Sequence, residues 1–248
     1  MTEQNDLPDL SGKTALVTGA SRGIGRDLSI ALVRAGAHVL ALARTSGGLE
    51  ELDDEIRAVG GTASLIPMDL MEGDSVEQLA AALMQRFDKL DILVANAAVL
   101  GELAPLTDID PKIWQATLDL NVTVNWRLIR ALDPLLQQSD DARAVFLTSR
   151  VGGELARAYW GAYGVSKAAM EMLAATYAEE NRNTNLSVAV IDPGPMRTDM
   201  RALAMPGEKP ETLPEPSALA PLLYHAVTAK SDELMRLVFR EWREAGKA

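Results

Sequence analysis

Short apolar runs alternate with longer segments of helical period along most of the 248-residue chain. The apolar runs predict β-strands, because each is nearly continuous in apolar residues over the length of a strand. They cover residues 13–18, 38–43, 64–68, 90–95, 144–148 and 186–191, and a last strand at 236–240 stays open. Helical patterns lie between them, at residues 22–34, 48–59, 75–87, 111–136 and 163–181. The alternation predicts an α/β fold, a doubly wound parallel sheet with helices on both faces.

Two segments fall outside this pattern. Residues 1–10 are mostly polar and acidic, and we expect a flexible tail there. Residues 205–221 contain prolines at 206, 210, 214, 216 and 221, and we expect an irregular lid beside the substrate over about 200–221. The chain has no internal repeat, so we expect a single domain over residues 1–248.

The composition is that of a folded and acidic protein, with 48% hydrophobic residues, 24% charged residues and a formal net charge of −11. Such a charge repels phosphates, so we expect no nucleic-acid partner and no anionic membrane surface as a partner. The chain has no cysteine and two histidines, which excludes disulfides and thiolate nucleophiles and gives no ligand set for a metal. It shows no leader pattern and no run of about 18 apolar residues, so the expected setting is cytoplasmic.

A glycine-rich turn joins the first predicted strand to the first predicted helix, with the sequence Thr18-Gly-Ala-Ser-Arg-Gly-Ile-Gly25. Glycine lets backbone N–H groups approach a pyrophosphate, and the positive end of the following helix favours the negative charge. An ordinary tight turn is the alternative, but the position between a strand and a helix near the start of the chain favours a dinucleotide site. The candidate cofactor-binding residues are Gly19, Ser21, Arg22, Gly23, Ile24 and Gly25.

The spacing G-x-x-x-G-x-G, with Thr18 before it, resembles the short-chain dehydrogenase/reductase family. Further matches follow in the order of that family: Asn96-Ala97-Ala98, Asn121, Tyr163-x-x-x-Lys167 and Pro193-Gly194-x-x-x-Thr198. The matches span roughly residues 11–200. Ala95 and Ala98 depart from the family's Asn-Asn-Ala-Gly motif, and residues 234–242 lack its usual glycine pair. The resemblance implies a Rossmann-type fold and a nicotinamide-dependent oxidoreductase.

Tyr163 and Lys167 are four residues apart, so they share one face of a helix. A neighbouring ammonium and a cationic nicotinamide both favour the phenolate, so we expect the pKa of Tyr163 to lie below its ordinary value of about 10. Such a tyrosine could donate a proton to a carbonyl oxygen as a hydride reaches the carbon, or accept it in reverse. The alternative is a pair of residues on the surface of a helix. Two features oppose it: the strand before the motif ends in Thr-Ser, and a Pro-Gly turn follows the motif.

The resemblance assigns roles to two more residues: Ser149 holds the substrate carbonyl, and Asn121 keeps a water chain from Lys167 to solvent. Relatives place the serine thirteen residues before the tyrosine, which is Arg150 here. The Ser-x-x-Gly pattern that begins at Ser149 favours that residue with a one-residue insertion after it, and Thr148 is the weaker alternative. Asn121 could instead be a satisfied residue of a helix kink.

The expected cofactor is NADP(H), because the second strand ends at Arg44 rather than at an acid that would bind the ribose 2′-hydroxyl of NAD. Arg22 is a second cation for the 2′-phosphate. A solvated loop arginine is the alternative for Arg44. The resemblance adds Asp69 as an adenine contact and further cofactor contacts at Asn96, Tyr163, Lys167, Pro193, Gly194 and Thr198.

We therefore expect an NADP(H)-dependent reductase or dehydrogenase acting on a small carbonyl or alcohol. Two alternatives are a β-ketoacyl thioester reductase, docking an acidic carrier through arginines, and a non-catalytic dinucleotide-binding redox sensor. The overall acidic charge opposes the first, and the presence of both Tyr163 and Lys167 opposes the second. The candidate docking arginines are Arg127, Arg130 and Arg197, and the expected pocket residues are Tyr159, Trp160, Met196, Leu203 and Met205.

The resemblance also implies a homodimer or homotetramer in which the helices at 111–136 and 163–181 pair with their symmetry mates. The alternative is that outer apolar residues such as Leu128 and Leu173 face the sheet.

Overall fold

The computed structural model describes residues 7–246 and contains one seven-stranded sheet, in the order β3-β2-β1-β4-β5-β6-β7, with every pair parallel. The strands are β1 (Thr14–Thr18), β2 (His38–Ala43), β3 (Ala63–Pro67), β4 (Ile92–Ala95), β5 (Ala142–Leu147), β6 (Leu186–Asp192) and β7 (Met235–Val238). This architecture confirms the predicted doubly wound α/β fold. The open question about a last strand is answered, since β7 pairs with β6 and ends before Phe239.

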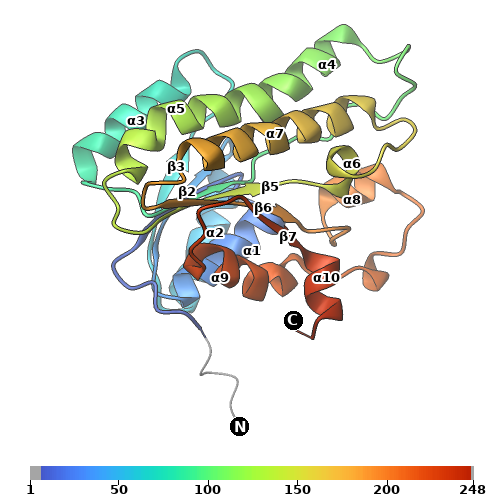
Figure 1. Ribbon diagram of the computed structural model, residues 1–248. Coiled ribbons are helices and arrows are strands. Elements are labelled where there is room, and N and C mark those ends of the chain that lie inside the picture. Colours follow the sequence, from blue (N-terminus) through green and yellow to red (C-terminus); the bar gives the residue numbers. More distant parts are fainter. Residues whose placement is uncertain (1–6, 247–248) are drawn as a thin grey trace.

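Helices cover both faces of the sheet (Figure 1). One face carries α1 (Gly23–Arg34), α2 (Ser46–Ala58), α9 (Ala220–Thr228) and α10 (Phe239–Glu244), and the other carries α3 (Ser75–Arg86), α5 (Val124–Leu136) and α7 (Gly161–Glu180). Successive residues of a strand alternate between the two cores: Ala15 and Val17 belong to the first and Leu16 to the second. This two-sided burial is why the strands are mostly apolar.

The helix expected at 111–136 is divided. It begins as α4 (Pro111–Leu118), where Asp110 caps the Lys112 N–H at 2.7 Å, and a π-helical turn (Asp119–Thr123) separates it from α5. Asn121 lies in this turn and is fully buried. A π turn adds one residue to the helical path, which a pattern of apolar positions does not reveal.

The remaining short elements gather at one end of the molecule (Figure 1). Helix α6 (Arg150–Gly153) follows β5, and α8 (Asp199–Ala204) follows β6. The proline-rich segment contains two 3₁₀ turns, Pro210–Thr212 and Pro216–Leu219.

The start of the expected tail, residues 1–6, lies outside the described residues. The last residue of the expected tail, Leu10, is not part of a flexible segment. It is buried, and its N–H donates to the Ala35 carbonyl at 2.7 Å.

The carboxyl ends of β1 and β4 are joined by the buried side chain of Thr18. Its Oγ1 accepts hydrogen bonds from the backbone N–H groups of Asn96 and Ala97, both at 3.0 Å. The Asn96 amide reaches back and donates to the carbonyls of Thr18 (2.9 Å) and Gly19 (3.2 Å). The chain thus ties the glycine-rich turn to the neighbouring strand at the point where the strand order reverses, which is where open α/β sheets bind ligands.

We expect Thr18→Val to lower the free energy of unfolding by about 2 kcal/mol or more, because it keeps the shape of the side chain but leaves two backbone N–H groups without an acceptor. Urea denaturation would measure this loss. Thr14→Val on the same strand is the matched control and should change stability far less, since Thr14 bonds Asp91 through its backbone N–H, which the substitution keeps. Equal losses in the two variants would contradict the bracing role of Thr18.

Candidate functional site

The glycine-rich turn is closed by backbone contacts that exclude side chains. A Cβ on Gly25 would lie 2.3 Å from the Gly19 carbonyl oxygen, and one on Gly19, whose φ is +66°, would lie 2.9 Å from the Asn96 amide nitrogen. Helix α1 begins at Gly23 with no side-chain cap and no acidic residue in its first turn. Its free N–H groups and positive end therefore suit an anion, which fits the phosphates of a dinucleotide.

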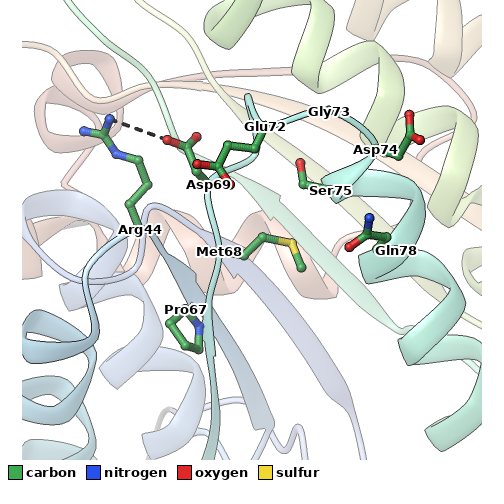
Figure 2. A pocket seen from close by; sticks show the side chains of 9 residues that line it. All are labelled: Arg44, Pro67, Met68, Asp69, Glu72, Gly73, Asp74, Ser75 and Gln78. Atoms are coloured by element: carbon green, nitrogen blue, oxygen red, sulfur yellow. Dashed lines mark ion pairs between the residues drawn. The ribbon is translucent and has the colours of Figure 1, made fainter.

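A cavity of about 630 Å³ lies where β2 and β3 end and α3 begins, and Figure 2 shows its lining. Arg44 and Asp69 face one another there at 3.9 Å. Ser75, in the first turn of α3, is buried and its hydroxyl has no hydrogen-bond partner. The other lining residues are Pro67, Met68, Glu72, Gly73, Asp74 and Gln78.

Each of the two arginines expected to bind a 2′-phosphate has a carboxylate beside it. Arg44 faces Asp69, and Arg22 lies 3.7 Å from Asp199 at the start of α8. Both pairs are largely exposed, so they are weak. A phosphate would have to replace these carboxylates as the partner of each guanidinium.

The Pro193-Gly194 turn and Thr198 lie at the end of β6. Gly194 has φ +65°, and its N–H donates to the Asp192 carboxylate at 2.9 Å. Thr198 caps α8 by accepting from the Arg201 N–H at 3.2 Å, and its methyl group would lie 3.4 Å from a Cβ on Gly23. This turn therefore meets the glycine-rich turn.

Asp192 itself is buried, and its second oxygen has no hydrogen-bond partner. Burial raises the pKa of Asp192. The hydrogen bond from the Gly194 N–H and the positive charge of Arg150 lower it in part.

Tyr163 and Lys167 share the buried face of α7, as their spacing predicts. The Lys167 ammonium lies 5.7 Å from the centre of the Tyr163 ring and donates to the Leu147 carbonyl at 2.7 Å. Ser149 follows β5 and caps α6 by accepting from the Val151 N–H at 3.2 Å. Arg150 is directed into an ion pair with Glu154 at 3.4 Å.

The pKa values of this pair move in opposite directions. Burial raises the pKa of Tyr163 to about 12, although a side-chain hydrogen bond with Ser149 lowers it, and the charge of Asp192 adds to the rise. Burial lowers the pKa of Lys167 to about 8, against the charge of Glu171. In the protein alone, loss of water around the phenolate outweighs the favourable contact with Ser149, and the lowering expected from a cationic nicotinamide stays a prediction.

Asn121 has every polar atom of its side chain engaged. Its Oδ1 accepts from the Val99 N–H, and its Nδ2 donates to the Val99 carbonyl and to the Ser166 hydroxyl, each at 2.9 Å. Its backbone carbonyl accepts from the Asn125 amide at 2.7 Å. These contacts fit the alternative of a satisfied residue at a helix kink, and the water-chain role stays a prediction.

Glu171 is the main contact that sequence reasoning missed. It lies one turn after Lys167, and its two oxygens accept hydrogen bonds from the Thr148 hydroxyl and from Arg236 of β7, both at 2.6 Å. Glu171 thus ties α7 to the residue after β5 and to β7, and puts a negative charge near the lysine. The spacing of four residues from Lys167 was a visible signal, but its partners are remote in sequence.

A small apolar cluster surrounds Tyr163, consisting of Leu100, Val151 and Ala204 with Leu103, Trp160, Met200 and Met205 packed around them. Trp160 and Met205 therefore lie where the sequence placed them, whereas Tyr159 and Leu203 are exposed. Met196 is a correction, because it is buried in the core on the α1 side of the sheet.

The candidate docking arginines are already engaged: Arg127 bonds Glu77, Arg197 bonds Glu215, and Arg130 stacks on Trp126. Among residues 7–246, no group of three or more histidine, cysteine, aspartate or glutamate residues is placed to hold a metal ion. No helix in this part of the chain has the length and apolar character needed to cross a membrane.

Known proteins resemble this chain in sequence. Residues 13–209 match the family model described as short chain dehydrogenase. The uncharacterized oxidoreductase YciK of Escherichia coli strain K12 is 37% identical over 216 residues, which cover 86% of this chain and 85% of YciK. A 3-oxoacyl-(acyl-carrier-protein) reductase of Synechocystis is 32% identical over 192 residues, which cover 77% of each chain.

Solved structures agree with this assignment. A protein of Shigella flexneri 2a in complex with NADP has a TM-score of 0.89 and 34% identity, covering 94% of this chain and 99% of that one. A protein of Escherichia coli CFT073 in complex with NADPH has a TM-score of 0.89 and 35% identity, covering 96% and 100%. The resemblance carried by the motifs is thereby confirmed: the chain belongs to the short-chain dehydrogenase family.

Proposed function

We propose that the protein is an NADP(H)-dependent oxidoreductase that interconverts a carbonyl compound and the corresponding alcohol, with Tyr163 as the general acid and base. The observation that carries the proposal is the buried Tyr163–Lys167 pair on α7, in which the Lys167 ammonium lies 5.7 Å from the centre of the Tyr163 ring. The carboxyl ends of β1, β4, β5 and β6 bring this group to the same edge of the sheet as the glycine-rich turn. The dinucleotide, when bound, supplies or accepts the hydride.

The raised pKa of Tyr163 suits proton donation. With a pKa of about 12 the phenol keeps its proton at neutral pH, so it can give that proton to a carbonyl oxygen when a hydride reaches the carbon. Ser149 would hold the same oxygen by its hydroxyl. The Lys167 ammonium, whose pKa is about 8, would stabilise the phenolate left behind, and Glu171 helps it to stay charged.

Tyr163→Phe should abolish turnover while cofactor affinity stays close to that of the wild type, because the change removes a proton donor and little else. NADPH consumption with a panel of aldehydes and ketones would measure turnover, and fluorescence titration would measure affinity. Tyr177→Phe is the matched control on the same helix, because the Tyr177 hydroxyl bonds Asp133 outside the site. Retention of more than a few per cent of activity in Tyr163→Phe would contradict the mechanism.

The preference for NADP(H) rests on Arg44 and Arg22. Arg44 lines the cavity beside the end of β2. Strand β2 has no acidic residue that could bind the ribose 2′-hydroxyl of NAD. The solved relatives with NADP and NADPH support the same choice. Cofactor roles for Ser21, Ile24, Asp69, Asn96, Pro193, Gly194 and Thr198 belong to this proposal.

Arg44→Ala should weaken NADPH binding by about tenfold and leave NADH binding nearly unchanged, since only NADPH has a phosphate for the guanidinium. The figure is modest because the phosphate must displace Asp69 from Arg44. Titration of both cofactors would test it, with Arg57→Ala as a control because Arg57 pairs with Asp53 on α2. Equal affinity of the wild type for NADPH and NADH would count against the proposal.

Ser149→Ala should lower kcat by about 100-fold, the effect of losing one donor to a developing oxyanion. Thr148→Ala should lower it much less, because the Thr148 hydroxyl is directed to Glu171. Steady-state kinetics of the two variants would measure the difference. The reverse order would mean that Thr148, and not Ser149, faces the substrate.

The carrier-thioester alternative has one supporting observation, the similarity to the Synechocystis reductase, whereas the engaged arginines speak against a docking patch.

For the assembly we propose a homodimer or homotetramer in the cytoplasm. Leu128 and Leu173 face the core, so the exposed apolar residues Ile113, Trp126, Val165 and Met172 would form the contact. A single domain, with residues 200–221 as a lid, completes the proposal.

A further inference from the structure

We propose that Arg157 recognises an anionic group on the substrate, so that the substrate class is an apolar carbonyl compound with a carboxylate or phosphate at some distance from the carbonyl. The inference rests on the proposed function and names the substrate of the same site. The apolar cluster around Tyr163 would take the body of such a molecule, and Arg157 would take its charged end.

The position of Arg157 is defined by contacts on both sides of the site. Its guanidinium lies 5.0 Å from the centre of the Trp160 ring, and Trp160 in turn packs edge-on against Tyr163 with ring centres 5.8 Å apart. On the other side its Nη2 lies 3.6 Å from the Met205 sulfur, just after α8. One aromatic ring therefore separates the guanidinium from the candidate catalytic tyrosine.

The backbone holds this arrangement at a cost. The Trp160 N–H donates to the Arg157 carbonyl at 3.2 Å, which closes a tight turn. Tyr159 in this turn has φ +72°, the only left-handed residue other than glycine in the described chain. Such a conformation costs about 1 kcal/mol or more for a bulky residue, and strain of this kind gathers at ligand sites. The turn fixes Arg157 beside Trp160.

In the described part of the chain, Arg157 is an exposed cation without a carboxylate partner of its own. Within residues 7–246 it has no ion pair, whereas its neighbours Arg150 and Arg201 pair with Glu154 and Glu208. Glu208 feels the charge of Arg157, but its two oxygens accept hydrogen bonds from Arg201 at 2.5 and 2.8 Å.

The contacts that Arg157 does make are with a π face and a thioether, which leave most of its five N–H donors free. A guanidinium with free donors binds carboxylate and phosphate in a bidentate manner.

The test compares matched substrates in wild type and Arg157→Gln. The probes are methyl-ketone fatty acids of increasing chain length, their methyl esters and the corresponding keto-alkyl phosphates, with NADPH consumption as the readout. For the wild type we expect kcat/KM at least about tenfold higher for an anionic member than for its ester, through KM rather than kcat. Arg157→Gln should reduce that ratio to about one. Comparison of the carboxylate and phosphate series identifies the source of the negative charge.

Arg130→Gln is the matched control, because Arg130 also stacks on an exposed indole, that of Trp126, at 5.7 Å. It should leave the ratio unchanged. Equal kcat/KM for acids, phosphates and esters in the wild type, or an unchanged ratio in Arg157→Gln, would overturn the inference.

A binding measurement separates this inference from the proposed function. In Tyr163→Phe with NADPH, calorimetry should find tighter binding of the anionic ketone than of its ester, and this difference should vanish when Arg157→Gln is added. If no ketone is reduced by the wild type but the difference in binding is present, the proposed reaction fails and the anion site stands. If reduction occurs and the binding difference is absent, the anion site fails alone.

Discussion

The Thr18 hydroxyl is the contact on which the carboxyl edge of the sheet depends. The strand order reverses between β1 and β4, and helices leave the two strands on opposite faces, so the two chains would diverge here without a link. Thr18 and Asn96 bridge them with four hydrogen bonds, two to backbone N–H groups and two to backbone carbonyls. The narrow space that results admits only glycine at 19 and 25, which keeps backbone rather than side chains at the surface of the turn.

The candidate site combines this rigid edge with an electrostatic contrast. Tyr163 and Lys167 are both buried, and burial favours the neutral form of each, which places a protonated phenol beside a lysine whose pKa is lowered to about 8. Glu171 moderates the contrast, because it is held by Thr148 and Arg236 and favours the charged lysine. A pair whose pKa values are set apart by their surroundings is a common basis for acid–base assignment.

The sequence predicted the fold well and the site in part. No bound of the six firmly predicted strands is more than two residues from that observed, because two-sided burial leaves an unmistakable apolar run. The π turn escaped notice, because one additional residue barely disturbs a helical period. The burial that raises the pKa of Tyr163 was not predicted, because the sequence shows its neighbour Lys167 but not the packing around the phenol. The contacts of Glu171 with Thr148 and Arg236, and of Arg22 with Asp199, could not be predicted either, because they join residues far apart in the sequence.

The π turn at Asp119–Thr123 has a consequence for evolution by insertion and deletion. Deleting one residue there would restore a regular helix and rotate the segments on either side by about 100° relative to each other. Either Asn121 would leave Val99 and Ser166, or the apolar stripe of α5 would turn away from the sheet. Surface loops tolerate insertions and deletions, but this helix does not. Its length therefore keeps Asn121 and the apolar face of α5 in a constant relation to each other.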